Sequence, residues 1–160
     1  MDLAAEATRE ISMAADLLAG CQVAERDQIA GKQSHIPGRA QSLIPPVYYD
    51  RADGLKVEAR LTFTRFYLGG GGAVHGGVLP LVFDELFGRL AGSGGRPRSR
   101  TAYLHVNYRN VTPLGKELRI EGSVDRTEGR KVVITGSLSD GETLLCDAEG
   151  LFVTLKSGQP

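Results

Sequence analysis

The stretch GGGGAVHGGVLPLVFDELFGRLA, residues 69–91, decides the fold of this protein. Its second part, from Val78 to Ala91, is apolar on nearly every side, which is typical of a helix buried in a core rather than one on a surface. Pro80 fits such a helix only in the first turn, where the backbone N–H groups have no intrahelical partner. The sequence therefore predicts a buried helix that begins near Gly76 or Gly77, directly after a glycine-rich turn.

The residues on both sides of this helix alternate with the period of two that is typical of β-strands. Residues 55–64 alternate apolar and polar side chains before the helix. After it, further strands are predicted over residues 101–109, 117–125, 131–138 and 143–156. One curved antiparallel sheet wrapped around one long central helix is the economical arrangement, which makes the fold α+β.

The N-terminal part of the chain has a different pattern. Leu3, Ala7, Ile11, Ala14 and Leu18 form one stripe at helical spacing, which predicts an extra amphipathic helix that ends near Gly20. Residues 25–50 lack periodicity and are interpreted as an extended connector. We therefore divide the chain into residues 1–50, helix and connector, and residues 51–157, the main domain.

The composition excludes several classes of protein. The chain has 160 residues, 41% of them apolar, with 19 basic and 19 acidic side chains, so it is long enough for one core but lacks the excess of basic residues that nucleic-acid binding needs. Its apolar runs fall short of the roughly 18 residues of a membrane helix, and its N-terminus is acidic. We expect a cytoplasmic protein that binds neither nucleic acid nor membrane.

No pattern of metal ligands is visible in the sequence. Cys21 and Cys146 lie far apart, and His35, His75 and His105 share no helical spacing. Structural metal sites need such residues clustered at short intervals. We expect no metal, and Cys146, which lies among apolar residues, is interpreted as a buried core residue.

Two features of the 69–91 stretch suggest chemistry. A glycine-rich turn at a helix N-terminus presents unpaired N–H groups, which suit an anion or a developing oxyanion, although the glycines could equally serve tight packing. Asp84 lies in the middle of a helix that should be interior, where an ionisable group needs a partner or a purpose. It could be a general base, or it could simply pair with an arginine.

The run His75-Gly76-Gly77, followed by Asp84 eight residues after Gly76, resembles the signature of hotdog-fold acyl-CoA thioesterases. The likeness is to the PaaI-type group and the related human thioesterase superfamily members. The segment TAYLHVNYR, residues 101–109, resembles a strand of that group of the form T-A-x-L-x-x-N-Y. Residues 128–131, EGRK, resemble the hairpin that follows, so the likeness covers about residues 54–156.

This resemblance implies a hotdog fold and the hydrolysis of acyl-CoA thioesters, in fatty acid metabolism or on related substrates. Asp84 would act as general base or nucleophile, the Gly76 N–H would bind the oxyanion, and Thr101 would orient water or the carboxylate. Two further residues of the turn, His75 and Gly77, would support the site. Contacts with CoA are expected from Asn107, Arg109, Arg130 and Lys131. No cofactor is implied, because CoA is part of the substrate.

The spacing of the two main groups predicts a homodimer. Eight residues of one helix separate Gly76 from Asp84 by roughly 12 Å, at 1.5 Å per residue. One carbonyl carbon cannot contact both, so the two groups must come from antiparallel helices of two protomers. A dimer of dimers is also compatible with this requirement.

The alternation of side chains along residues 101–109 predicts which of them face the helix. We expect one set of side chains to face the helix, namely Ala102, Leu104, Val106 and Tyr108. Thr101, Asn107 and Arg109 should then face away, and Thr101 would reach Asp84 only from the strand end or from a partner.

Two other functions remain open. They are a non-catalytic acyl-CoA-binding protein and, disfavoured because residues 76–91 contain no histidine, an enoyl-thioester hydratase. The acyl group, fatty or aryl, is not determined.

Overall fold

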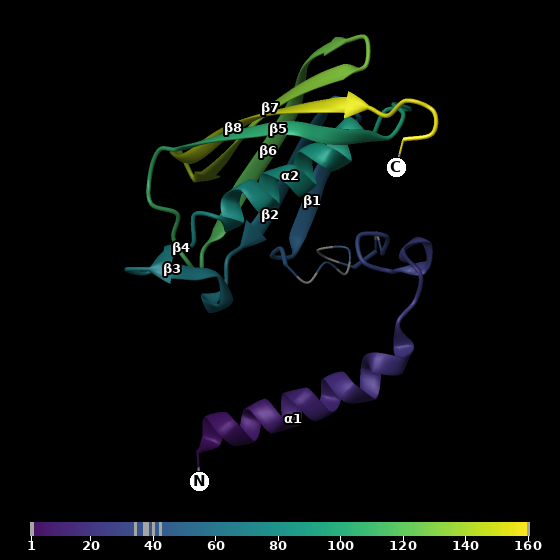
Figure 1. Cartoon of the computed structure of the whole chain (residues 1–160). Helices are drawn as coiled ribbons and strands as arrows, with labels where there is room; N and C mark the ends of the chain where they lie inside the picture. The colour runs from purple at the N-terminus through teal and green to yellow at the C-terminus, as the bar shows by residue number, and fades with distance from the viewer. Residues whose placement is uncertain (1, 34, 37–38, 40, 42, 160) are drawn as a thin grey trace.

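A computed structural model of the chain describes residues 2–33, 35–36, 39, 41 and 43–159. Its centre is one helix, α2 (Val78–Ala91), held in the concave side of a six-stranded antiparallel sheet of order β1-β2-β6-β7-β8-β5 (Figure 1). The strands are β1 (Val47–Ala52), β2 (Lys56–Thr62), β5 (Ser99–Tyr108), β6 (Glu117–Glu128), β7 (Lys131–Asp140) and β8 (Thr143–Thr154). This confirms the predicted α+β architecture.

The segment between β2 and α2 forms a small separate ribbon. It contains a 3₁₀ turn, η4 (Arg65–Tyr67), and the short strands β3 (Leu68–Gly70) and β4 (Ala73–Val74), which pair with each other. Gly69 allows the two strands to approach closely, because a Cβ there would lie 2.6 Å from the Cα of His75. The ribbon thereby delivers the chain into the first turn of α2.

The helix begins where the sequence predicts. Gly77 is its N-cap residue and Val78 its first residue, so Pro80 lies in the first turn and removes no intrahelical hydrogen bond. Seven of its side chains are buried, which agrees with a helix that is apolar nearly all round: Leu79, Val82, Phe83, Leu86, Phe87, Leu90 and Ala91.

The sheet makes room for one of these side chains with glycines. Gly122, Gly136 and Gly150 lie on three neighbouring strands, and an added Cβ on each would lie 3.3, 2.7 and 2.9 Å from the ring of Phe87, respectively. Phe87 is fully buried. The ring thus packs directly on the sheet backbone, which fixes how α2 lies across the strands.

The prediction for residues 25–50 is wrong at its end, because β1 begins at Val47 and pairs with β2. The segment VYYDRA has two adjacent tyrosines and a charged half, which hide the period of two. Its antiparallel partner supplies the stabilisation that the local pattern does not show.

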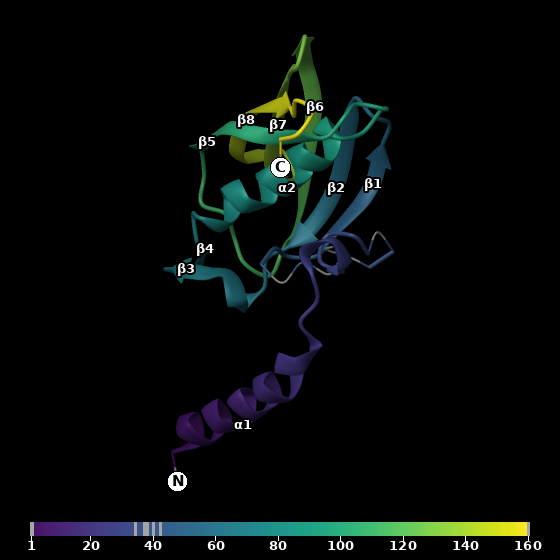
Figure 2. The ribbon, with the colours of Figure 1, turned by 45° about the vertical axis from the view of Figure 1, so that its right-hand side comes forward.

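The N-terminal helix α1 (Leu3–Leu18) has the predicted bounds but makes no contribution to the core. None of the side chains described for this helix is buried. The helix stands away from the sheet in both views (Figures 1 and 2). Two short 3₁₀ turns follow, η1 (Ala19–Cys21) and η2 (Glu25–Asp27). Farther on, Arg39 contacts the central helix through a half-buried 3.0 Å salt bridge with Glu85. None of the helices in the described part of the chain is both long and apolar enough to cross a membrane.

Candidate active site

The turn at the start of α2 has an unpaired backbone donor. The Gly77 N–H donates to Nδ1 of His75 at 3.0 Å, and the His75 N–H donates to the carbonyl of Tyr67 at 2.8 Å. Within the described residues, the Gly76 N–H between them donates to no protein acceptor. Gly76 therefore presents its N–H at the positive end of the helix, where an anionic oxygen is stabilised.

Asp84 lies farther along the same helix and is only partly buried. Its Oδ1 accepts a 2.8 Å hydrogen bond from the hydroxyl of Thr101, which belongs to β5. Among the residues that the structure describes, the carboxylate forms no salt bridge, although Arg39, Arg89 and Arg100 line the same cavity. The carboxylate of Asp84 is thus oriented by a neutral partner and not neutralised by an arginine.

The two groups open into different cavities of the single chain. Asp84 and Thr101 line a cavity of about 590 Å³ with Gly88 and Phe152. Gly76 lines another of about 440 Å³ with Leu79, Tyr108, Arg109 and Thr112. The two sets of lining residues share no member, so one protomer does not bring the amide donor and the carboxylate to a common site.

The parity expected for Thr101 is wrong. The pairing of β5 with β8 shifts register between Thr101 and Tyr103, where Thr101 faces Phe152 and Tyr103 faces Leu151. Ala102 is therefore the extra residue of a β-bulge, which reverses the parity before it. Thr101 shares the helix-facing side with Phe152 and reaches Asp84 within its own chain.

The expected CoA-binding residues divide into two groups at opposite ends of β5. Asn107 and Arg109 both bind the carboxylate of Asp147, at 2.9 and 2.6 Å. The Arg109 hydrogen bond, followed by that of Asn107, lowers the pKa of Asp147 below its usual range. Both residues are thus oriented on the outer face of the sheet, where His105 also contacts Asn107 at 3.0 Å.

Arg130 and Lys131 lie at the other end, in the hairpin between β6 and β7. Arg130 donates to the carbonyl of Thr154 at 2.9 Å and lines a cavity of about 440 Å³ with Arg100 and Thr101. Lys131 is exposed. This second group therefore lies on the side of Thr101 and Asp84, while Asn107 and Arg109 lie on the side of Gly76.

Sequence reasoning missed Tyr108, which it placed on the helix-facing side without a role. Its hydroxyl donates to the carbonyl of Gly76 at 2.9 Å, and its ring lies 3.6 Å from the position of a Cβ on that glycine. The parity pattern indicated the correct face. It gave no sign of the contact, because Gly76 lies 32 residues earlier in the chain.

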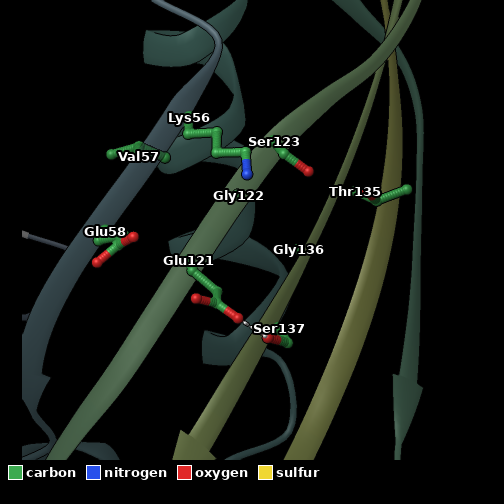
Figure 3. Close-up of a pocket in the computed structure, with 9 residues that line it drawn as sticks. All are labelled: Lys56, Val57, Glu58, Glu121, Gly122, Ser123, Thr135, Gly136 and Ser137. Atoms are coloured by element: carbon green, nitrogen blue, oxygen red, sulfur yellow. Dashed lines mark hydrogen bonds between the residues drawn. The ribbon is translucent and has the colours of Figure 1, made fainter. Parts of the chain in front are cut away.

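A further hollow of about 340 Å³ lies on the outer face of the sheet, away from α2 (Figure 3). It is formed by β2, β6 and β7, and its polar lining includes Lys56, Glu121, Ser123 and Ser137. None of the predicted site residues reaches it. Among the described residues, no group of three or more His, Cys, Asp or Glu side chains is arranged to hold a metal ion.

Comparison with known proteins shows what the central part of the chain resembles. The family described as Thioesterase superfamily matches residues 71–146, which include the turn at Gly76, Asp84 and Thr101. A thioesterase superfamily protein of known crystal structure superposes with a TM-score of 0.78 at 28% identity, over 96% of this chain and 79% of that one. Residues 71–146 are thus similar to the thioesterase superfamily, and the fold agrees with the hotdog fold of its structural neighbours.

Curated proteins that resemble the chain are acyl-CoA thioesterases by name. Acyl-coenzyme A thioesterase THEM4 of Bos taurus is 33% identical over 86 residues, which are 52% of this chain and 35% of that protein. THEM4 of Mus musculus is 31% identical over 91 residues, 56% of this chain and 39% of that protein. The matched region thus spans little more than a third of the length of these curated relatives.

More distant structures share the fold alone. The PaaI protein of E. coli superposes with a TM-score of 0.62 at 17% identity, over 67% of this chain and 82% of that one. A hypothetical thioesterase from Streptococcus pneumoniae TIGR4, crystallised with coenzyme A, gives 0.63 at 20% identity, over 67% and 86%.

Proposed function

We propose that the protein hydrolyses acyl-CoA thioesters to the free acid and CoA, in a site built by two protomers. The observation that carries this proposal is the Asp84 carboxylate, held by Thr101 at 2.8 Å in a cavity where none of the described arginines forms a salt bridge with it. The similarity of residues 71–146 to the thioesterase superfamily and the name of the THEM4 relatives support the choice of reaction.

The chemistry follows from the two groups. Asp84 removes a proton from a water molecule whose oxygen attacks the thioester carbonyl carbon, or it attacks that carbon itself. The carbonyl oxygen takes the negative charge and accepts the hydrogen bond of the Gly76 N–H, which the helix N-terminus strengthens. On the general-base route the C–S bond then breaks, and CoA leaves with its sulfur taking up the proton that Asp84 removed from water. On the nucleophilic route CoA leaves as the thiolate and an acyl–Asp84 anhydride remains, which water hydrolyses to the free acid and the regenerated carboxylate, and the released proton goes to the thiolate. CoA is part of the substrate, and the reaction needs no other cofactor and no metal.

The requirement for two protomers rests on the separate cavities of Gly76 and Asp84. Strand β5 offers the means of joining them, because it is a ten-residue strand at the edge of the sheet. An unpaired edge of this length is a template for another strand. Antiparallel pairing of two β5 strands about their middle sets Thr101 of one protomer beside the Tyr108 end of the other. Asp84 and Gly76 then face each other across the two-fold axis.

The two groups of CoA residues fit the same arrangement. Asn107 and Arg109 belong to the Gly76 end of β5, and Arg130 and Lys131 to the Asp84 end. In a dimer that joins these ends, both groups flank one composite site. Arginine at these positions suits the phosphates of CoA, which it binds in bidentate fashion. A dimer of dimers and a cytoplasmic location remain predictions from the sequence.

The test of this proposal is the variant Asp84→Asn, which keeps the size of the side chain and removes the basic oxygen. We expect kcat for acyl-CoA hydrolysis to fall by about 100-fold or more, because a positioned general base contributes roughly 10²–10⁴-fold. Release of the CoA thiol should be measured over short, long and aryl esters, which also determines the acyl preference.

The same assay separates the competing functions. Tight binding of acyl-CoA by the unaltered protein, without release of thiol from any ester, would favour a non-catalytic binding protein. Hydration of crotonyl-CoA without thiol release would favour a hydratase. An Asp84→Asn protein with unchanged kcat would remove the assignment of Asp84.

A further inference from the structure

The turn at residues 75–77 is held by its neighbours on both sides of the unpaired donor. The Gly77 N–H binds the imidazole of His75, so this peptide is held by the side chain that precedes it. The Gly76 carbonyl accepts the hydroxyl of Tyr108 at 2.9 Å and, at the longer distance of 3.3 Å, the N–H of Leu79. The shorter of these two contacts therefore comes from β5 and not from the helix.

Gly76 needs such support because glycine has no Cβ to restrict its backbone dihedral angles. Its N–H and its carbonyl belong to two different peptide planes, and their relative direction is set by those angles. The peptide that carries the N–H is held by the Val78 N–H, which donates to the His75 carbonyl at 3.0 Å, and the Tyr108 hydrogen bond holds the next peptide, so that the two together limit the dihedral angles of Gly76. An oxyanion donor is effective only when it is already directed at the position where the charge develops.

We propose that Tyr108 is a positioning residue for the Gly76 oxyanion donor, an inference that rests on the proposed function. Its hydroxyl links the glycine-rich turn to the sheet. Strand β5 then carries both supports of the site, with the Thr101 hydroxyl on Asp84 near one end and the Tyr108 hydroxyl on Gly76 at the other. Because both residues belong to one strand, that strand holds the amide donor and the carboxylate at fixed positions relative to each other.

The variant Tyr108→Phe tests this inference, because it keeps the ring and removes only the hydroxyl. We expect kcat for acyl-CoA hydrolysis to fall roughly 3- to 10-fold, which corresponds to one hydrogen bond of ordinary net strength. KM for the CoA ester should stay at its wild-type value, and the midpoint of thermal unfolding should fall no further than in the variant Tyr103→Phe, which also loses one hydroxyl hydrogen bond. A merely structural tyrosine would lower the unfolding midpoint and leave kcat unchanged.

Tyr103→Phe is the matched control. Tyr103 lies on the same strand, is partly exposed, and also donates its hydroxyl to a protein acceptor, the carboxylate of Glu149, but within the described residues it forms no hydrogen bond with the turn. We expect its kcat to equal that of the wild type. An equal fall of kcat in both variants would contradict a specific role of Tyr108.

Further outcomes distinguish a failure of the inference on Tyr108 from a failure of the proposed function. A rise in KM with unchanged kcat would show that Tyr108 contacts the substrate, and would overturn the positioning role. If Asp84→Asn is inactive while Tyr108→Phe is fully active, the inference on Tyr108 fails and the proposed function stands. If Asp84→Asn keeps full activity, the proposed function itself fails.

Discussion

At the scale of single residues, the two cysteines lie in opposite environments. Cys146 is fully buried in β8, as its apolar neighbours predict, and burial raises the pKa of its thiol to about 12. Cys21 is exposed, just after α1. Because the thiolate is the reactive form, Cys146 is protected both by its protonation and by its lack of access to solvent.

We therefore expect one thiol per chain to react with Ellman's reagent in the native protein at pH 8, and two after denaturation in guanidinium chloride. The variant Cys21→Ser should show none in the native state, and it also removes this background from a thiol-release assay. Rapid native labelling of the Cys21→Ser protein would contradict the described burial of Cys146.

The role of Thr101 shows the limit of residue-level prediction. The sequence motif marked Thr101 as a candidate, but alternation placed it on the wrong face, because a bulge of one residue at Ala102 cannot be seen in a local pattern. Tyr108 was missed for a related reason. Its partner Gly76 is a backbone carbonyl far away in the chain, and no residue type marks such an acceptor.

At the scale of elements, the position of α2 depends on the fit between Phe87 and the glycines of the sheet. In the variant Gly150→Ala the new Cβ would lie 2.9 Å from the Phe87 ring and 3.1 Å from the Phe152 ring. Overpacking of this kind costs roughly 1–3 kcal/mol. We expect the free energy of unfolding, measured by urea denaturation, to fall by that amount.

The cause can be isolated by a double-mutant cycle with Phe87→Leu, which shortens the side chain that meets the new methyl group. The cost of Gly150→Ala should be smaller in the Phe87→Leu background than in the wild type. Gly20→Ala is the control, because nothing lies within 4 Å of a Cβ at that position, and it should leave stability unchanged. Strictly additive costs in the cycle would show that Phe87 does not clash with the new methyl group.

Most of the fold could be predicted because most of its helices and strands have clear local sequence signals. The bounds of α1 and α2 follow from local signals, namely an apolar stripe, a buried apolar run and a glycine start. The four strands after α2 have clear alternation, and the structure confirms them within a few residues. Strand β1 was missed because it gains its order from pairing with β2, which is a long-range property.

At the scale of the whole molecule, the candidate catalytic groups of one chain lie near opposite ends of one strand, β5. The Gly76 N–H and the Asp84 carboxylate line different cavities, and the same strand supports each of them. The sequence could predict this separation from helix geometry alone, since eight residues of helix span roughly 12 Å. The partner that closes the gap lies outside a single chain, so the arrangement of two protomers is a proposal that mixed dimers can test.

Two inactive variants should restore activity to each other if each site takes Gly76 from one protomer and Asp84 from the other. Gly76→Pro removes the N–H donor, and Asp84→Asn removes the base. In a mixed dimer, the Asp84→Asn protomer lends an intact Gly76 to the intact Asp84 of its Gly76→Pro partner, which makes one complete site. Random mixing yields mixed dimers in half of the population, each with one working site of two, so about a quarter of wild-type activity is expected.

The measurement is thiol release by the two variants co-expressed with different affinity tags, after purification of the doubly tagged dimer, which should have about half of the wild-type kcat per dimer. Size-exclusion chromatography of each variant alone first establishes that it folds and dimerises. Co-expressed Asp84→Asn and Thr101→Val serve as the matched control, because both changes fall in the same half of the site and no mixed dimer can assemble a complete one from them. If the purified Gly76→Pro/Asp84→Asn dimer is as inactive as its parents, the amide and the carboxylate do not meet across the two-fold axis.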